Sequence, residues 1–280
     1  FNLALVFLHE AYLRASAGNE KSPLVPSILA GCMFALLCFT HWLAFWPFLG
    51  IFVVVATSFP ANRVVALGVS SPVIVSFGAW GLRNIAVYGD PLGIAKQGPL
   101  AALSQGSSNP LLRDYSPDLN FLLKGLPSKL AYGTVSQLET LYVFLGSVVV
   151  APLFFIAVLH NYRNPAVRTF RWIILSAWVF SAFGMVLFGI DGEKKVAFNQ
   201  MHILFMPIMS AFGLALLSIL WGRLQIRSGH IYVLRGPLIA AIVISALPLV
   251  FSLPQKISRG LQGKTKSVTL ANWPPYYPPV

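Results

Sequence analysis

The sequence predicts an all-α polytopic transmembrane bundle of about eight membrane helices, some short or kinked, with one long extracytoplasmic loop. Hydrophobic residues make up 56% of the 280 residues and charged residues only 10%, which is more apolar surface than one soluble core can hide. Apolar runs long enough to span a bilayer recur along the chain. Several of these runs contain proline, which predicts kinked or broken helices.

The runs define the expected helices in chain order. Residues 1–13 are expected to form the end of one helix. The stretch Val25 to Thr57 is too long for one span and too short for two, so we expect two short helices, Pro26 to Phe39 and Leu43 to Ala56, that turn at Thr40 to Trp42. The other runs approach the ~20 residues that a span needs. They are Ala66 to Gly81, Leu141 to Leu159, Trp172 to Ile190, Met201 to Trp221 and Pro237 to Leu253.

This pattern divides the chain into four parts. Residues 1–82 hold transmembrane helices, including the short pair at 26–56, and residues 139–254 hold four more. Between them, residues 83–138 form the extracytoplasmic loop, whose length favours short amphipathic helices that roof a site. Residues 255–280 are expected to begin an extracytoplasmic C-terminal segment.

Basic residues in short loops predict the orientation. The loops His160 to Arg171 and Trp221 to Arg235 each contain three arginines and no acid, so both are expected in the cytoplasm. Alternation then places Arg63 and the loop Arg14 to Pro23 inside as well, and the turn at Thr40 to Trp42 outside. Four basic residues between 256 and 266 would also lie outside, although long translocated segments follow the rule poorly.

The composition limits the chemistry. Cys32 and Cys38 are six residues apart, which is neither a metal-ligand spacing nor a disulfide framework. The chain has no phosphate-binding loop, dinucleotide fingerprint or zinc-protease motif, so no soluble-type cofactor is indicated.

Its basic residues are dispersed over loops, which argues against nucleic acid as a partner. Acid-base chemistry must draw on eight carboxylates: Glu10, Glu20, Asp90, Asp114, Asp118, Glu139, Asp191 and Glu193.

Three stretches resemble one family. SPVIVSFGAWGLRNIAVYGDPLG contains a Trp-x-x-Arg-Asn element followed by a Tyr-Gly-x-Pro turn, SILAGCMFALLCFTHWLAFWPFLG is similar to a Gly-rich helix pair, and QMHILFMPIMSAFGLALL is similar to a late helix with spaced prolines. Together they resemble GT-C type membrane glycosyltransferases of the dolichyl-phosphate-mannose mannosyltransferase-like group. The resemblance implies transfer of a sugar from a polyprenyl-phosphate donor to a glycan, lipid or protein acceptor on the extracytoplasmic face. It also implies a multi-pass protein of the bacterial inner membrane, with dependence on a divalent metal left open.

The chain departs from the family pattern at three places. It has His41 where the family has Arg or Lys, and Gln200, Met201 and His202 where the family has Arg. Nothing in it matches the family's catalytic acid, which lies in a first outer loop. Because the chain also opens inside an apolar run, we expect a C-terminal fragment that lacks the catalytic part and is inactive by itself.

The resemblance suggests substrate-binding residues. Arg83, followed by Asn84, is the candidate for a phosphate, because a guanidinium offers a planar bidentate fork at headgroup depth. Arg83 could equally anchor its helix at the interface by extending its side chain toward the headgroups. His41 could face a sugar or a phosphate, or simply close a tight turn.

Other candidates have equally plain alternatives. Lys194 and Lys195 could meet a phosphate or form a solvated cluster, and His202 could bind substrate or make an interfacial hydrogen bond. Asp90 could serve as an acid near the outer face or set a turn, as Asp before Pro commonly does. Two other functions stay open: a transporter or flippase, for which charged residues in mid-membrane are expected, and a non-catalytic assembly protein.

Overall fold

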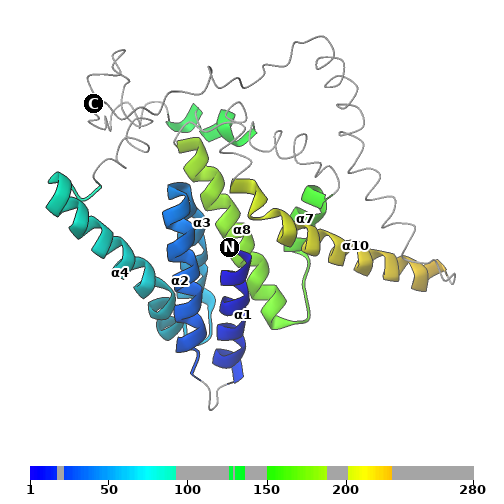
Figure 1. The fold of residues 1–280 in the computed structure, drawn as a ribbon. Helices are drawn as coiled ribbons and strands as arrows, with labels where there is room; N and C mark the ends of the chain where they lie inside the picture. The colour runs from blue at the N-terminus through cyan, green and yellow to red at the C-terminus, as the bar shows by residue number, and fades with distance from the viewer. Residues whose placement is uncertain (18–21, 93–125, 129, 136–149, 188–200, 229–280) are drawn as a thin grey trace, which may run out of the picture.

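The computed structural model describes residues 1–17, 22–92, 126–128, 130–135, 150–187 and 201–228. In these ranges every regular element is a helix (Figure 1). Three of the described helices are long and apolar enough to cross a membrane, at Asn62–Tyr88, Pro165–Leu187 and Met206–Arg223. The expected span at 237–253, most of the long loop and the segment 255–280 lie outside the described residues.

The described residues up to Ser58 form four helical elements. Helix α1 covers Asn2–Ala17, α2 covers Leu24–Thr40, the short 3-10 helix η1 covers Trp42–Ala44, and α3 covers Phe45–Ser58. The expected short pair is therefore α2 and α3, joined through an extended residue at His41 (φ −152°, ψ 116°). The hydroxyl of Thr40 donates to the carbonyl of Leu37 at 2.7 Å, which satisfies one carbonyl at the end of α2.

Helix α4 (Asn62–Tyr88) is longer than the sequence pattern predicts. It ends at Gly89, which has a left-handed conformation (φ 71°) and donates its N–H to the carbonyl of Ile85 at 2.9 Å. Glycine adopts this conformation without steric cost, and nothing before it stops the helix. Residues 83–88, expected to begin the outer loop, are therefore helical.

Helix α8 (Pro165–Leu187) also begins earlier than expected. Asn164 caps it, because its side-chain oxygen accepts from the N–H groups of Ala166 at 2.9 Å and Val167 at 3.4 Å. Pro165 suits the first helical position, where its missing N–H costs nothing. Arg168 and Arg171, which the sequence places in a loop, therefore lie in the first two turns of this helix.

Small residues bring α2 and α4 into close contact. A Cβ atom added at Gly31 of α2 would lie 2.4 Å from the carbonyl oxygen of Val69 and 2.9 Å from the ring of Pro72. One turn earlier, a Cβ atom at Gly68 of α4 would lie 2.6 Å from the Cβ of Ser27. This is the small-residue packing by which helices associate in membranes.

Helices α3 and α8 pack in the same way. The hydroxyl of Ser176 donates to the carbonyl of Gly50 at 2.9 Å, a hydrogen bond between the two helices. Further along, the indole of Trp46 lies where a side chain at position 184 would be, since a Cβ atom at Gly184 would be 2.4 Å from its ring. Gly31, Gly50 and Gly184 therefore all lie at close contacts between helices.

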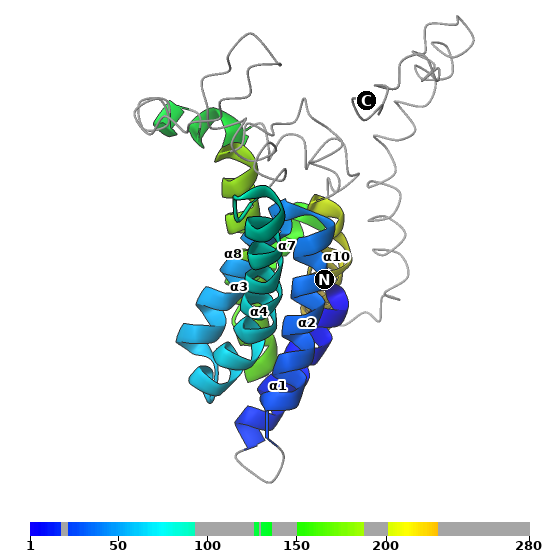
Figure 2. The ribbon, with the colours of Figure 1, turned by 60° about the vertical axis from the view of Figure 1, so that its left-hand side comes forward.

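Helices α7 (Val150–Leu159) and α10 (Met206–Ser228) pack against each other, and α10 runs across the others (Figures 1 and 2). Phe212 of α10 contacts Phe154 of α7 edge-on, with ring centroids 6.3 Å apart. Phe205, just before α10, contacts Phe1 at 5.1 Å. These contacts connect α10 to the N-terminal end of α1.

An aromatic cluster holds three chain segments at one end of the helices. Tyr12 of α1 lies 5.1 Å from Phe59, which follows α3, and 6.2 Å from Phe170 near the start of α8, measured between ring centroids. Arg14 in the last turn of α1 and the basic starts of α4 and α8 therefore lie at the same end. We call it the arginine end, and it contains residues from three of the four segments that the sequence predicts to lie in the cytoplasm.

Candidate functional site

Arg83 lies on the exposed C-terminal part of α4, at the end of the helices opposite the arginine end. In Figure 1 this part of α4 leans away from α2 and α3. Phe77 of α4 stacks on Phe39 of α2, with centroids 4.8 Å apart and planes 9° from parallel. Arg83 is six residues beyond this stack, so it lies about 9 Å further along the helix axis. Its position fits either interpretation, the phosphate ligand or the interfacial anchor.

Asn84 and Asp90 shape the end of α4. Asn84 is only 3% exposed, and its amide nitrogen donates to the carbonyl of Pro91 at 3.2 Å. The carboxylate of Asp90 accepts the N–H of Leu92 at 2.8 Å, which is the turn that an Asp before Pro favours. Both side chains therefore stabilise the turn that follows Gly89.

His41 lies at the same end, where α2 passes into α3. Its ring is half-buried, and Nδ1 accepts the N–H of Leu43 at 3.3 Å, while its carbonyl accepts the N–H of Ala44 at 2.9 Å. His41 is two residues beyond the Phe39 stack, so Arg83 stands about 6 Å further out along the helix axes. The turn-closing role of His41 is thus present.

His202 is buried and does not lie exposed at an interface. It is 1% exposed, and its carbonyl accepts the N–H of Phe205 at 3.0 Å. Lys194 and Lys195 lie outside the described residues. In the part of the chain that the structure describes, no three His, Cys, Asp or Glu side chains are grouped to hold a metal ion.

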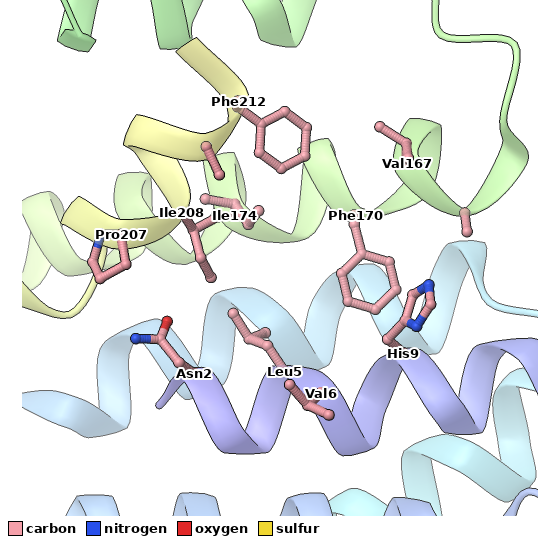
Figure 3. A pocket seen from close by; sticks show the side chains of 12 residues that line it. Asn2, Leu5, Val6, His9, Val167, Phe170, Ile174, Pro207, Ile208 and Phe212 are labelled. Carbon is pink, nitrogen blue, oxygen red and sulfur yellow. The ribbon is translucent and has the colours of Figure 1, made fainter. Parts of the chain in front are cut away.

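A groove that sequence reasoning missed lies between α1, α8 and α10 (Figure 3). Its volume is about 550 Å³. Asn2 and His9 are the polar residues among those that line it, and the ring of His9 meets Phe170 edge-on at 5.3 Å. Its walls are otherwise apolar, formed by residues that include Leu5, Val6, Ile174, Pro207, Ile208 and Phe212.

Arg171 beside this groove is buried, although the sequence suggests a solvated loop arginine. It is 8% exposed, its Nη1 donates to the carbonyl of His160, and its guanidinium lies 5.3 Å from the ring centre of Trp172. Its Nε has no hydrogen-bond partner among the described residues. The nearby hydroxyl of Tyr162 is likewise buried and lacks a partner there. Burial raises the pKa of Tyr162, while the charge of Arg171 opposes that rise.

Comparisons of the chain with protein-family models, with curated proteins and with solved structures gave no match. The assignment of function therefore depends on the residues and their arrangement.

Proposed function

We propose that the protein is a GT-C type membrane glycosyltransferase that moves a hexose or pentose from a polyprenyl-phosphate donor to an acceptor on the extracytoplasmic face of a bacterial inner membrane. About eight membrane helices, oriented with the arginine end in the cytoplasm, belong to this proposal. The observation that supports it is that His41, Arg83 and Asp90 all lie at the end opposite the arginine end, with His41 inside the broken helix pair and Arg83 and Asp90 at and just beyond the C-terminal end of α4.

The chemistry requires a base for the acceptor hydroxyl and a cation for the departing phosphate. Arg83 supplies the cation, because its side chain is exposed near the end of a long apolar helix. Of the two described acids, Glu10 pairs with Arg14 at 2.8 Å at the arginine end, and Asp90 accepts a turn N–H. We therefore propose that the base is not among the described residues.

The positions of charge favour a transferase over a transporter. In the three candidate spans the charged side chains are Arg63, Arg83, Arg168, Arg171 and Arg223, and all lie near helix ends. Transporters commonly place ionisable groups in mid-membrane, where they mark an ion or substrate path. The described spans have none there.

Binding of a fluorescent polyprenyl monophosphate to the protein in nanodiscs tests the proposal. Arg83→Ala should weaken binding by about tenfold or more, because a charge-assisted hydrogen bond contributes about 1.5–3 kcal/mol. Arg83→Lys should recover part of the affinity, and Arg223→Ala, an exposed arginine on α10, should leave it unchanged. In a transfer assay, Arg83→Ala should abolish sugar transfer but leave membrane insertion intact.

If Arg83→Ala and the parent protein bind polyprenyl monophosphate with equal affinity, Arg83 is an interfacial anchor and not a phosphate ligand. If the parent protein binds polyprenyl phosphate and polyprenol with equal affinity, the proposal that its donor is a polyprenyl-phosphate sugar is wrong.

A further inference from the structure

The groove between α1, α8 and α10 has the form of a lipid-chain site. Its volume of about 550 Å³ is within the range of about 300–1,000 Å³ that is usual for ligand sites. Side chains from α1, α8 and α10 line it, and its walls are almost entirely apolar (Figure 3). An elongated hydrocarbon chain fits such a surface better than a compact polar ligand, which would leave its hydrogen-bonding groups without partners.

Positive charge is concentrated where α8 enters this groove. Val167 and Phe170 line the groove, and Arg168 and Arg171 follow each of them directly on the same two turns. The first turn of α8 contains no acid, and the N-terminus of the helix adds positive partial charge. Glu10, the described acid at this end, is already paired with Arg14. The arginines of α8 therefore lack a described counter-charge.

Arg171 supplies an independent observation that points to an anion. The residue is 8% exposed and its Nη1 donates to the carbonyl of His160, yet its Nε has no partner among the described residues. A buried charged group with a hydrogen bond left unmade is costly. The hydroxyl of Tyr162 is a second buried donor without a described partner. Tyr162 meets Phe212 of the groove edge-on at 6.1 Å, so these donors lie next to the groove wall. A phosphate offers several acceptor oxygens for donors of this kind.

We propose that this groove binds an anionic phospholipid from the leaflet at the arginine end, with an acyl chain along α1, α8 and α10 and the phosphate against Arg168 and Arg171. Charge complementarity selects this occupant, because a zwitterionic lipid offers no net negative charge to the arginines. The site is at the opposite end from Arg83, so its loss and the loss of polyprenyl-phosphate binding are separate measurements.

Native mass spectrometry of the purified protein with equimolar dioleoylphosphatidylglycerol and dioleoylphosphatidylcholine tests the site. The parent protein should retain the anionic lipid in about tenfold excess, the ratio expected from one additional charged hydrogen bond. Arg168→Gln should remove most of that preference, and its exposed position leaves the packing intact. Ala211→Trp, an exposed lining residue of α10, should block retention of the lipid by filling the groove.

The matched control is Arg63→Gln, which removes one exposed arginine from the same end but from α4, which does not line the groove. It should keep the full preference. Arg171→Lys keeps the charge and should retain part of it, and a folded Arg168→Gln decides the question if Arg171→Lys does not fold.

Three results would overturn the proposal. Equal retention of the two lipids would show that the arginines do not select a charged headgroup. Unchanged lipid retention in Ala211→Trp would show that the lipid does not bind in this groove. Displacement of the lipid by inorganic phosphate or glycerol 3-phosphate at equal concentration would indicate a site for a free anion instead of a lipid.

Discussion

The substitution Gly31→Ala should destabilise the helix pair α2 and α4. The new Cβ atom would lie 2.4 Å from the Val69 carbonyl oxygen and 2.9 Å from two ring carbons of Pro72, whereas ordinary contact begins at 3.4 Å. The two backbones must therefore move apart by about 1 Å. Backbone and a proline ring cannot rotate away as a flexible side chain would. Overpacking of this kind costs about 1–3 kcal/mol.

The thiols of α2 provide the assay. Cys38 is buried at 3% exposure, so a thiol-reactive dye reports its release from the α2 contacts during heating. Replacing Cys32 by Ala leaves Cys38 as the sole thiol. In this background Gly31→Ala should lower the midpoint of dye labelling.

The control is Gly78→Ala on α4, where an added Cβ atom meets nothing within 4 Å. It should be neutral or should stabilise the helix by up to about 1 kcal/mol, since alanine favours helix over glycine. A midpoint for Gly31→Ala equal to or above that of Gly78→Ala would refute the close-packing argument.

Three further substitutions test other features. Ala61→Gly should increase the free energy of unfolding by about 0.5–1 kcal/mol and so raise the thermal midpoint, because Ala61 holds a left-handed conformation (φ 48°) that is strained for a residue with a Cβ atom. A lower midpoint would contradict this reasoning. Ser176→Ala removes the hydrogen bond to the Gly50 carbonyl and should cost about 0.5–1.5 kcal/mol in a detergent unfolding titration, and no loss would show that the bond is energetically neutral. Burial raises the pKa of Tyr162, so the unfolded chain releases that proton first and stability falls as pH rises above the ordinary tyrosine value of about 10. Tyr162→Phe should make the pH profile of the thermal midpoint shallower in that range, and identical profiles would exclude this linkage.

The sequence could predict the helix break at His41 but not the end of α4. The break shows in the sequence because polar residues interrupt an apolar run that is too long for one helix. At the end of α4, Arg83 and Asn84 look like the start of a polar loop, and only the conformation of Gly89 decides that the helix continues to Tyr88. The polarity of Arg83 and Asn84 therefore predicted the wrong end for α4, because the backbone conformation of Gly89 determines where this helix stops.

The groove and the burial of Arg171 could not be predicted for a different reason. The lining residues come from α1, α8 and α10, and sequence shows which faces are apolar but not which of them meet. Arg171 has the local sequence of a loop arginine, and it becomes buried only because His160 and Tyr162 fold back over the first turns of α8. Both features depend on tertiary contacts between segments that are far apart in the sequence.

The lengths of α2 and α3 create a hydrophobic mismatch in the proposed membrane setting. At 1.5 Å per residue, their 17 and 14 residues give about 25 and 21 Å, against a hydrocarbon core of about 30 Å. A bilayer meets a short helix by thinning around it. The surface of the membrane would therefore dip over His41 while α4 rises beside the depression. Bilayers of shorter acyl chains should relieve this deformation, so the lipid thickness in which the protein is most stable should lie below that of a typical bilayer.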